Sequence, residues 1–355
     1  MAVEIKENFA LAPLTTLKVG GAARFFASAE NENEIVEAFD FAQKRDFQTF
    51  ILGGGSNVLI SDRGFDGLVL KIANRGIEII REKNKTRVTA QAGEDWDEFV
   101  RICVEENLAG VECLSGIPGS VGATPVQNVG AYGQEVSETI ESVRVLERAS
   151  RKIFDLTNAD CRFSYRSSIF NTFARDRFVV LAVSFVLEPN GEPAIRYKDL
   201  QQFFAKIEKP NLRETRDAVF QIRRAKSMVI AVNDLNSKSA GSFFKNPIVE
   251  TGKFARIAEI ARRLKFIESE TLPPHFPAGE NSVKLPAAWL IEKAGFEKGY
   301  TKNKRAGTSS NHTLAIVNCG SASAADILDL AMEIQARVRE IFGVELKPEP
   351  VFIGF

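Results

Sequence analysis

Two glycine-rich passages are the part of the sequence best suited to bind a ligand. The first is Gly53-Gly54-Gly55-Ser56-Asn57, and the second covers residues 115–133. Glycine lets successive backbone N–H groups turn toward one point, and such a concavity binds phosphate without a cationic side chain. The first passage alone is more typical of a tight hairpin turn. Two such passages in one chain, however, indicate a nucleotide cofactor.

The spacing of the first passage does not match the usual dinucleotide fingerprint. That fingerprint, GxGxxG, opens a helix, whereas Gly53-x-Gly55 leads into a strand-like run at residues 58–60. Long glycine-rich loops inside a compact protein are usually functional, because they offer few side chains for a core. In the second passage Gln127, Asn128 and Tyr132 could bond to or stack on a ring system, or could only stabilise turns.

Composition excludes several classes of protein. The 355 residues include 46 Lys+Arg and 46 Asp+Glu, so no net charge favours nucleic acid or an anionic membrane. Glu4, Lys6 and Glu7 stand where a secretory signal needs an apolar run, so we expect a cytoplasmic protein. Only His275 and His312 are present and no GxSxG occurs, so we expect neither a metal site nor a Ser-His-Asp hydrolase. The four cysteines lack CxxC spacing and are expected to be reduced.

Capping residues and hydrophobic periodicity predict the elements that position these passages. Helices are predicted at residues 31–44, from 95 onward, at 211–226, 252–264 and 286–294, and over a last helix that stops at Gly343. Strands are predicted at residues 47–52, 58–60, 140–146, 177–187 and 312–317. A chain of this length is expected to form two or three subdomains.

Six longer motifs occur in order along almost the whole chain. They are TTLKVGG at residues 15–21, LGGGSN at 52–57, GIPGSVG at 116–122, YRSSIF at 165–170, GSFFKNP at 241–247 and PEP at 348–350. In these motifs the sequence resembles the UDP-N-acetylenolpyruvoylglucosamine reductases, flavoproteins of peptidoglycan synthesis.

The resemblance implies an α+β protein with a two-subdomain FAD-binding fold of the vanillyl-alcohol oxidase type and a C-terminal α+β substrate-binding domain. The implied FAD-binding subdomains are residues 1–73 and 74–225, and the UDP-sugar domain is 226–355, with a tail that returns to the active site. The implied reaction is the NADPH-dependent reduction of UDP-N-acetylglucosamine enolpyruvate to UDP-N-acetylmuramate. FAD would carry the hydride and be bound non-covalently, because both histidines lie outside the flavin region. A monomer that binds the UDP-sugar, and neither nucleic acid nor a membrane, is expected.

Matching motifs also imply where FAD binds. The resemblance places its pyrophosphate at residues 53–57 and 119–122 and the flavin near residues 128–132. The implied cofactor-binding residues are Leu52, Gly53, Gly54, Gly55, Ser56, Asn57, Gly119, Ser120, Gly122, Ala123, Asn128 and Tyr132.

Three residues match catalytic positions of the family. Arg166 would hold the substrate carboxylate with its planar guanidinium, and Ser242 would give a proton to the carbanion. Glu349, stiffened between Pro348 and Pro350, would polarise the enolpyruvyl group or act as an acid. Without the resemblance, these residues would be a surface ion pair, a cap or turn serine and an exposed carboxylate.

Five further residues match substrate-binding positions, namely Tyr165, Tyr197, Lys226, Asn246 and His312. Lys226 would face the diphosphate, although the segment after it is longer than in many relatives and lacks their Leu-Pro-Asp-Pro. Tyr197 indicates the subgroup that retains a tyrosine-bearing, substrate-covering loop. Residue types alone would make Tyr197 a half-buried aromatic, Asn246 a turn residue and His312 a core imidazole.

Two other functions stay open at this point. One is another FAD oxidoreductase of the same fold that acts on a different sugar or alcohol, and the other is a flavin- or nucleotide-binding regulatory protein. The combination of Arg166, Ser242 and Glu349 argues against both.

Overall fold

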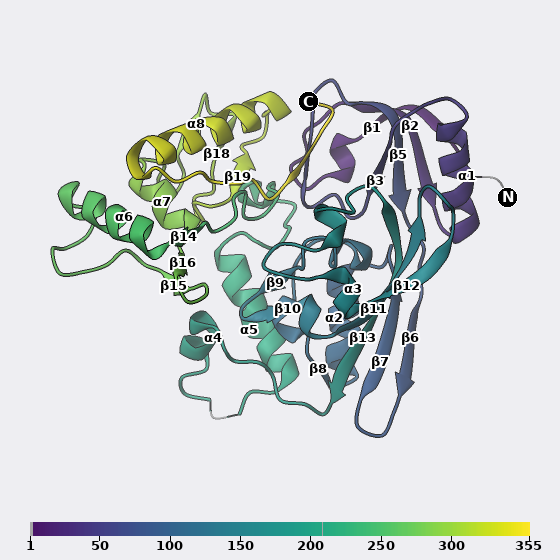
Figure 1. Cartoon of the computed structure of the whole chain (residues 1–355), viewed down its shortest axis with the longest axis horizontal. Coiled ribbons are helices and arrows are strands. Elements are labelled where there is room, and N and C mark those ends of the chain that lie inside the picture. Colours follow the sequence, from purple (N-terminus) through teal and green to yellow (C-terminus); the bar gives the residue numbers. More distant parts are fainter. Residues whose placement is uncertain (1–2, 208) are drawn as a thin grey trace. The chain divides into compact units, whose positions relative to one another are not determined.

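The computed structural model describes residues 3–207 and 209–355, and the chain divides into two compact units (Figure 1). Unit 1 comprises Met1–Ala10, Ala22–Ser56 and Gly64–Val229, and unit 2 comprises Leu11–Gly21, Asn57–Arg63 and Ile230–Phe355. Unit 2 therefore includes two short segments from the N-terminal part of the sequence. Each unit has its own core of buried apolar residues.

The first sheet of unit 1 has four strands in the order β1-β2-β5-β3. They are β1 (Lys6–Ala10), β2 (Ala22–Ala29), β5 (Phe65–Ile72) and β3 (Thr49–Leu52). β1 is antiparallel to β2, whereas β2 and β3 both run parallel to β5. Helix α1 (Glu32–Gln43) is capped by Asn31 and packs Ile35, Ala38 and Phe39 into the core that it shares with this sheet (Figure 1).

The second sheet of unit 1 is antiparallel and has the order β12-β11-β13-β7-β6. Its strands are β12 (Ile153–Thr157), β11 (Ile140–Glu147), β13 (Phe178–Pro189), β7 (Thr86–Gln91) and β6 (Ile77–Arg81), and β8 (Leu108–Ala109) pairs with the end of β13. Helix α2 (Trp96–Glu105), capped by Asp95, packs Trp96 and Phe99 against Phe185. The Trp96 indole also donates to Leu114 O at 3.0 Å, which ties α2 to the residue directly before the second glycine passage.

Shorter elements complete unit 1. The 3₁₀ helices are η2 (Glu112–Leu114), η3 (Val121–Ala123), η4 (Val136–Glu138) and η5 (Ile169–Asn171). A small hairpin joins β9 (Gly130–Ala131) and β10 (Gln134–Glu135). The remaining helices are α3 (Asn158–Cys161), α4 (Lys198–Phe203) and α5 (Leu212–Ala225).

Unit 2 is built from three small sheets and three longer helices. The sheets are β14 (Ile248–Glu250) with β16 (Ser282–Lys284) and β15 (Phe276–Pro277), then β17 (Thr301–Lys302) with β18 (Ala306–Thr308) and β19 (Ile316–Asn318), and the parallel pair β4 (Val58–Ile60) and β20 (Val351–Ile353). The helices are α6 (Thr251–Arg263), α7 (Ala287–Lys293) and α8 (Ala324–Phe342), with the 3₁₀ turns η1 (Ala12–Leu14) and η6 (Leu235–Ser237).

Helix α8 is held at both ends. Ser323 and Asp326 form a reciprocal capping box, and the Asp62 carboxylate accepts from the N–H groups of Ala324 and Ala325. At the other end Gly343 adopts a left-handed conformation with φ of +63°, which stops the helix. A carboxylate from residues 57–63 therefore fixes a helix that begins far along the chain.

All six predicted helices are confirmed, as α1, α2, α5, α6, α7 and α8. Two local predictions are wrong. The first glycine passage is not a hairpin turn, since β3 pairs with β5 and β4 pairs with β20. The strand expected at residues 312–317 begins only at Ile316, because a turn comes first in which Ala315 N–H donates to His312 O at 3.0 Å.

The four cysteines are free thiols, as predicted, and all but Cys319 are buried. Burial raises the pKa of the Cys161 thiol to about 12, so it stays protonated at neutral pH. In the described part of the chain, no helix is both long and apolar enough to cross a membrane.

Candidate active site

The two glycine passages meet in unit 1. A side chain at Gly54 would place its Cβ 2.6 Å from Gly119 Cα and 3.0 Å from Ser120 N, so only glycine allows this approach. Gly119 has φ of +142°, a conformation that other residues rarely adopt. Because β3 ends at Leu52, the contact lies beyond the carboxyl end of a parallel strand, where sheets of this kind place ligands.

Backbone donors gather at this contact. Across residues 3–207 and 209–355, the N–H groups of Gly54, Gly55, Gly119 and Ser120 donate to no protein acceptor. Gly55 and Ser120 are buried, and a buried N–H group without a partner is costly. Converging N–H groups of this kind bind anions, so the residues present fit the pyrophosphate of FAD.

Gly122 and Ala123, also predicted to bind the cofactor, use their N–H groups differently. The Gly122 N–H donates to Ala92 O at 2.9 Å and the Ala123 N–H donates to Ser120 O at 3.0 Å. A Cβ at Gly122 would lie 2.4 Å from Ala92 Cβ. Their backbones therefore fix the shape of the passage from within the protein.

Charged side chains fix the start of the second passage. Gly116 N–H donates to Asp97 Oδ1 at 2.6 Å, and both Nη atoms of Arg216 bind the same carboxylate at 2.8 and 2.9 Å. Gly116 O accepts from Arg223 Nε at 3.2 Å, and Arg223 also donates to Met228 O at 2.7 Å. Arg223 is buried, and this burial lowers the pKa of its guanidinium. Sequence reasoning did not identify the roles of these three charged residues.

Asn128 connects two parts of the predicted flavin region. It is completely buried, with φ of +47°. Its Nδ2 donates to Glu135 Oε2 at 2.7 Å and to Ser164 O at 3.2 Å, and its Oδ1 accepts from Ser137 N–H at 3.1 Å. Both amide donors are thus used inside the protein, which joins the β9–β10 hairpin to the turn that carries Arg166.

Arg166 lies in a tight turn. Ser164 and Ser167 exchange two backbone hydrogen bonds of 3.0 Å, with Tyr165 and Arg166 between them. Arg166 has φ of +53°, which costs a non-glycine residue about 1–2 kcal/mol. Its Nη2 donates to Gly130 O at 2.9 Å, and its guanidinium lies 5.4 Å from the centre of the Tyr165 ring. Such a strained, well-held conformation is typical of functional positions.

Residues predicted for cofactor and for substrate meet at two tyrosines. The rings of Tyr132 and Tyr197 lie edge to face with centroids 5.6 Å apart. Lys226 Nζ lies 5.9 Å from the centre of the Tyr132 ring and 2.7 Å from Asp199 Oδ2. Burial raises the pKa of both tyrosines, so their hydroxyl groups stay protonated and can donate hydrogen bonds.

In unit 2 the backbone brings Ser242 and Glu349 together. Phe244 and Pro348 form an antiparallel bridge, and Glu349 N–H donates to Phe243 O at 2.9 Å. Asn57 holds the same segment from a third part of the chain, since its Nδ2 donates to Glu349 O at 3.2 Å. The predicted proton donor and the predicted carboxylate thus lie on paired segments.

The other predicted residues of unit 2 lie on segments that also have structural contacts. Asn246 Oδ1 accepts from Ala287 N–H at 2.8 Å, at the start of α7. His312 lies two residues before Leu314, whose carbonyl accepts from Phe243 N–H at 2.8 Å. His312 is therefore on a segment bonded to the one that carries Ser242.

Known proteins are similar to this chain in sequence and in fold. Residues 23–156 match a family model described as FAD binding domain, and residues 233–353 match one described as UDP-N-acetylenolpyruvoylglucosamine reductase, C-terminal domain. The UDP-N-acetylenolpyruvoylglucosamine reductase of Thermobifida fusca is 43% identical over 358 residues, which cover 100% of this chain and 99% of the relative. That of Streptomyces coelicolor is 46% identical over 349 residues, covering 97% and 89%. The crystal structure of the reductase from Thermus caldophilus, 23% identical and covering 99% of both chains, shares the fold with a TM-score of 0.65.

The fold and the glycine-lined site define an α+β FAD-binding oxidoreductase, which confirms the predicted class. Within that class, the chain belongs to the UDP-N-acetylenolpyruvoylglucosamine reductase family.

Proposed function

We propose that this protein reduces UDP-N-acetylglucosamine enolpyruvate to UDP-N-acetylmuramate in peptidoglycan precursor synthesis, with NADPH as the electron donor. The observation that carries the proposal is the likeness to reductases of that name over the whole chain, including the segments of Arg166, Ser242 and Glu349. No comparable observation favours an oxidoreductase for another sugar or alcohol, or a regulatory protein.

The cofactor would be non-covalent FAD, which supplies two-electron transfer from NADPH to the substrate. The backbone N–H groups of Gly54, Gly55, Gly119 and Ser120 would hold its pyrophosphate. The remaining cofactor positions predicted from the sequence are also proposed to bind FAD. The side chain of Asn128 would act mainly by holding the hairpin and the Arg166 turn in place, because its amide bonds within the protein.

The three catalytic side chains would act on the charge that reduction creates. Addition of a hydride to the enolpyruvyl methylene carbon leaves negative charge on the carbon beside the carboxylate. Arg166 would bind that carboxylate, Ser242 would donate the proton and Glu349 would polarise the enolpyruvyl group. Donors aimed at such charge contribute about 10²–10³ in rate, and a positioned acid contributes about 10²–10⁴.

The UDP-sugar would be bound by Tyr165, Tyr197, Lys226, Asn246 and His312, with Tyr197 on a substrate-covering loop. The proposed division of the chain is residues 1–73 and 74–225 for FAD and 226–355 for the UDP-sugar. We place the protein in the cytoplasm as a monomer that engages neither nucleic acid nor a membrane.

Half-reactions measured without oxygen test the proposal. In Ser242→Ala, NADPH should bleach the flavin at a nearly unchanged rate, whereas reoxidation by the enolpyruvyl UDP-sugar should slow by about 10²–10⁴. Ser321→Ala, which changes an exposed serine of unit 2, should behave like the wild type. Equal loss of both half-reactions would contradict the role of Ser242, and flavin reduction by simple alcohols would favour the alternative oxidoreductase.

A further inference from the structure

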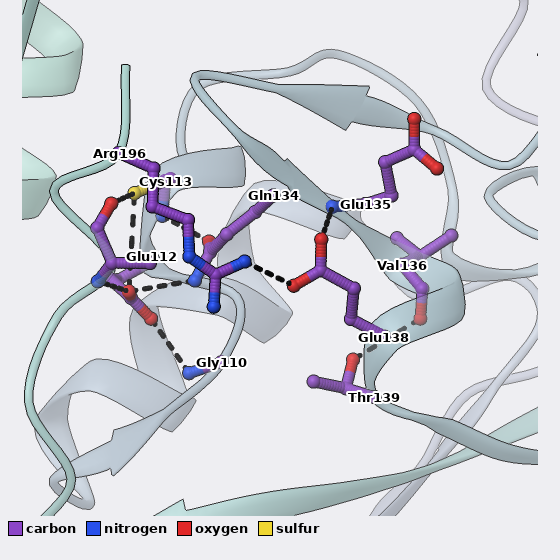
Figure 2. A network of polar contacts seen from close by, with 10 residues as sticks. Gly110, Glu112, Cys113, Gln134, Glu135, Val136, Glu138, Thr139 and Arg196 are labelled. Carbon is purple, nitrogen blue, oxygen red and sulfur yellow. Dashed lines mark hydrogen bonds and ion pairs between the residues drawn. The ribbon is translucent and has the colours of Figure 1, made fainter. Parts of the chain in front are cut away.

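One buried carboxylate joins the two segments of unit 1 that carry Tyr132 and Tyr197. Glu112 in η2 is 0% exposed, and its carboxylate accepts hydrogen bonds from three N–H donors and a long one, of 4.0 Å, from Cys113 Sγ (Figure 2). Its Oε2 accepts from Gly110 N–H at 2.8 Å. Its Oε1 accepts from Gln134 Nε2 at 2.8 Å and from Ala194 N–H at 2.9 Å. The two oxygens of a carboxylate can accept from all three N–H donors. An amide has one acceptor oxygen and an NH₂ group, so it cannot satisfy all three.

The contact with Gln134 orients the hairpin that carries Tyr132. Gln134 begins β10, and Tyr132 and Gly133 form the turn between β9 and β10. Gln134 Oε1 accepts from Cys113 N–H at 2.8 Å, so its NH₂ group must face Glu112. The Gln134 side chain thus bonds to both Glu112 and Cys113, and these two hydrogen bonds hold the start of β10 (Figure 2).

The contact with Ala194 orients the segment that leads to Tyr197. We call residues 190–197, which join β13 to α4, the connector. Ala194 is bonded at both backbone groups, since its N–H donates to Glu112 and its carbonyl accepts from Cys113 Sγ at 3.3 Å. Other contacts also hold the connector. Asn190, at its start, donates its N–H to Asn107 O at 2.8 Å, and Arg196 pairs with Glu138, where the two side chains are 66% and 42% exposed. Asn190 is far from Tyr197 along the chain and exposed pairs contribute little, so we take the bonds of Ala194 as the anchor of Tyr197.

We propose that Glu112 is a positioning residue for substrate binding. It sets the hairpin and the connector relative to each other, and so keeps the rings of Tyr132 and Tyr197 at their edge-to-face distance of 5.6 Å. The inference rests on the proposed function, because that function assigns Tyr197 to the UDP-sugar. Loss of the anchor frees Tyr197 and weakens sugar binding. The proposed function gives Tyr197 no role in flavin reduction by NADPH, so that step should continue.

The first test replaces the carboxylate with an amide of the same size. In Glu112→Gln one of the three donors faces an NH₂ group, so the dissociation constant of the enolpyruvyl UDP-sugar should rise about tenfold. Binding is measured from the flavin absorbance of the oxidised protein without NADPH. Flavin reduction by NADPH should change by less than about twofold. The control is Glu138→Gln in η4, which removes the charge paired with Arg196 of the connector and should leave both values within about twofold.

A double-mutant cycle tests whether Glu112 acts through Tyr197. In a Tyr197→Ala background, Glu112→Gln should weaken binding of the sugar no further, because the residue it positions is gone. Independent, multiplicative losses would overturn the proposal. So would an unchanged dissociation constant in Glu112→Gln.

A polarity swap keeps the proposal testable if the single variant does not fold. In Glu112→Gln with Gln134→Glu, the amide of residue 112 can donate to the carboxylate of residue 134, which still accepts from Cys113 N–H. Ala194 N–H alone loses its acceptor. Hydrogen exchange at Ala194 should become at least about tenfold faster and the sugar should bind about tenfold more weakly. Exchange and affinity as in the wild type would overturn the proposal, whereas a wild-type flavin that the sugar cannot reoxidise would refute the proposed function instead.

Discussion

The close contact of Gly54 with Gly119 predicts that adding a single methyl group at residue 54 disturbs the cofactor site. In Gly54→Ala the new Cβ would lie 2.6 Å from Gly119 Cα, so the two passages must move apart. We expect the purified variant to retain much less FAD, measured as the ratio of flavin to protein absorbance. Gly252→Ala is the control, because nothing lies within 4 Å of its added Cβ in α6. Full FAD content in Gly54→Ala would contradict this use of the passage.

The partial burial of Tyr132 and Tyr197 predicts a loss of stability in alkali. Burial raises the folded-state pKa of Tyr132 and Tyr197 above the value of about 10 expected in the unfolded chain. The protonated form is then favoured by folding, so this stability is fully present below about pH 10 and is lost as the pH rises through the folded pKa. The thermal midpoint of Tyr132→Phe should fall less steeply above about pH 10 than that of the wild type. Parallel curves would contradict the prediction.

Part of the candidate site could be proposed from the sequence, because its residues stand in contiguous motifs. Gly54, Gly119 and Ser242 are of this kind. Glu112 and Arg223 are not, since an isolated charged residue is normally exposed and only the folded chain shows its burial. The position of Glu112 between apolar residues in the run LAGVECL was the one available signal.

Among the helices, the first turn of α8 offers a test of acid stability. The pKa of Asp326 is lowered, first by the hydrogen bond from Ser323 N–H at 2.9 Å. A depressed folded pKa contributes stability that is present above the unfolded value of about 3.9 and is lost as the pH falls through the folded pKa. Asp326→Asn should therefore unfold more easily at pH 7, by up to about 1 kcal/mol, and depend less on pH below about 4. Denaturant unfolding at both pH values measures this, and an equal destabilisation at both would contradict it.

Elements were predicted best where their signals are local. Asn31, Asp95 and Asn211 each cap a helix, and their residue types mark the starts of α1, α2 and α5. The last helix, α8, was predicted from its apolar spacing and from Gly343 at its end. The partners of β3 and β4 were not predictable, because the glycine passage suggested that the two strands pair with each other. Their actual partners are β5 and β20, and nothing in the neighbouring residues specifies such distant pairing.

For the whole molecule, the composition of unit 2 predicts that its C-terminal part cannot fold alone. Its core includes Leu17, Val19 and Leu59, and β20 pairs with β4 from residues 57–63. A fragment of residues 230–355 lacks these segments and should show no cooperative thermal unfolding by circular dichroism, while the full chain does. A fragment with a sharp transition and native helix content would contradict the prediction.

The same pairing of β4 with β20 has a consequence for synthesis on the ribosome. Residues 58–60 emerge from the ribosome well before their partners at residues 351–353. At about 5–20 residues per second, the early strand waits roughly 15–60 s for its partner. During that interval Leu59 and Ile60 are apolar residues without their final neighbours. A stalled or prematurely terminated chain therefore exposes an apolar segment that chaperones and proteases can recognise.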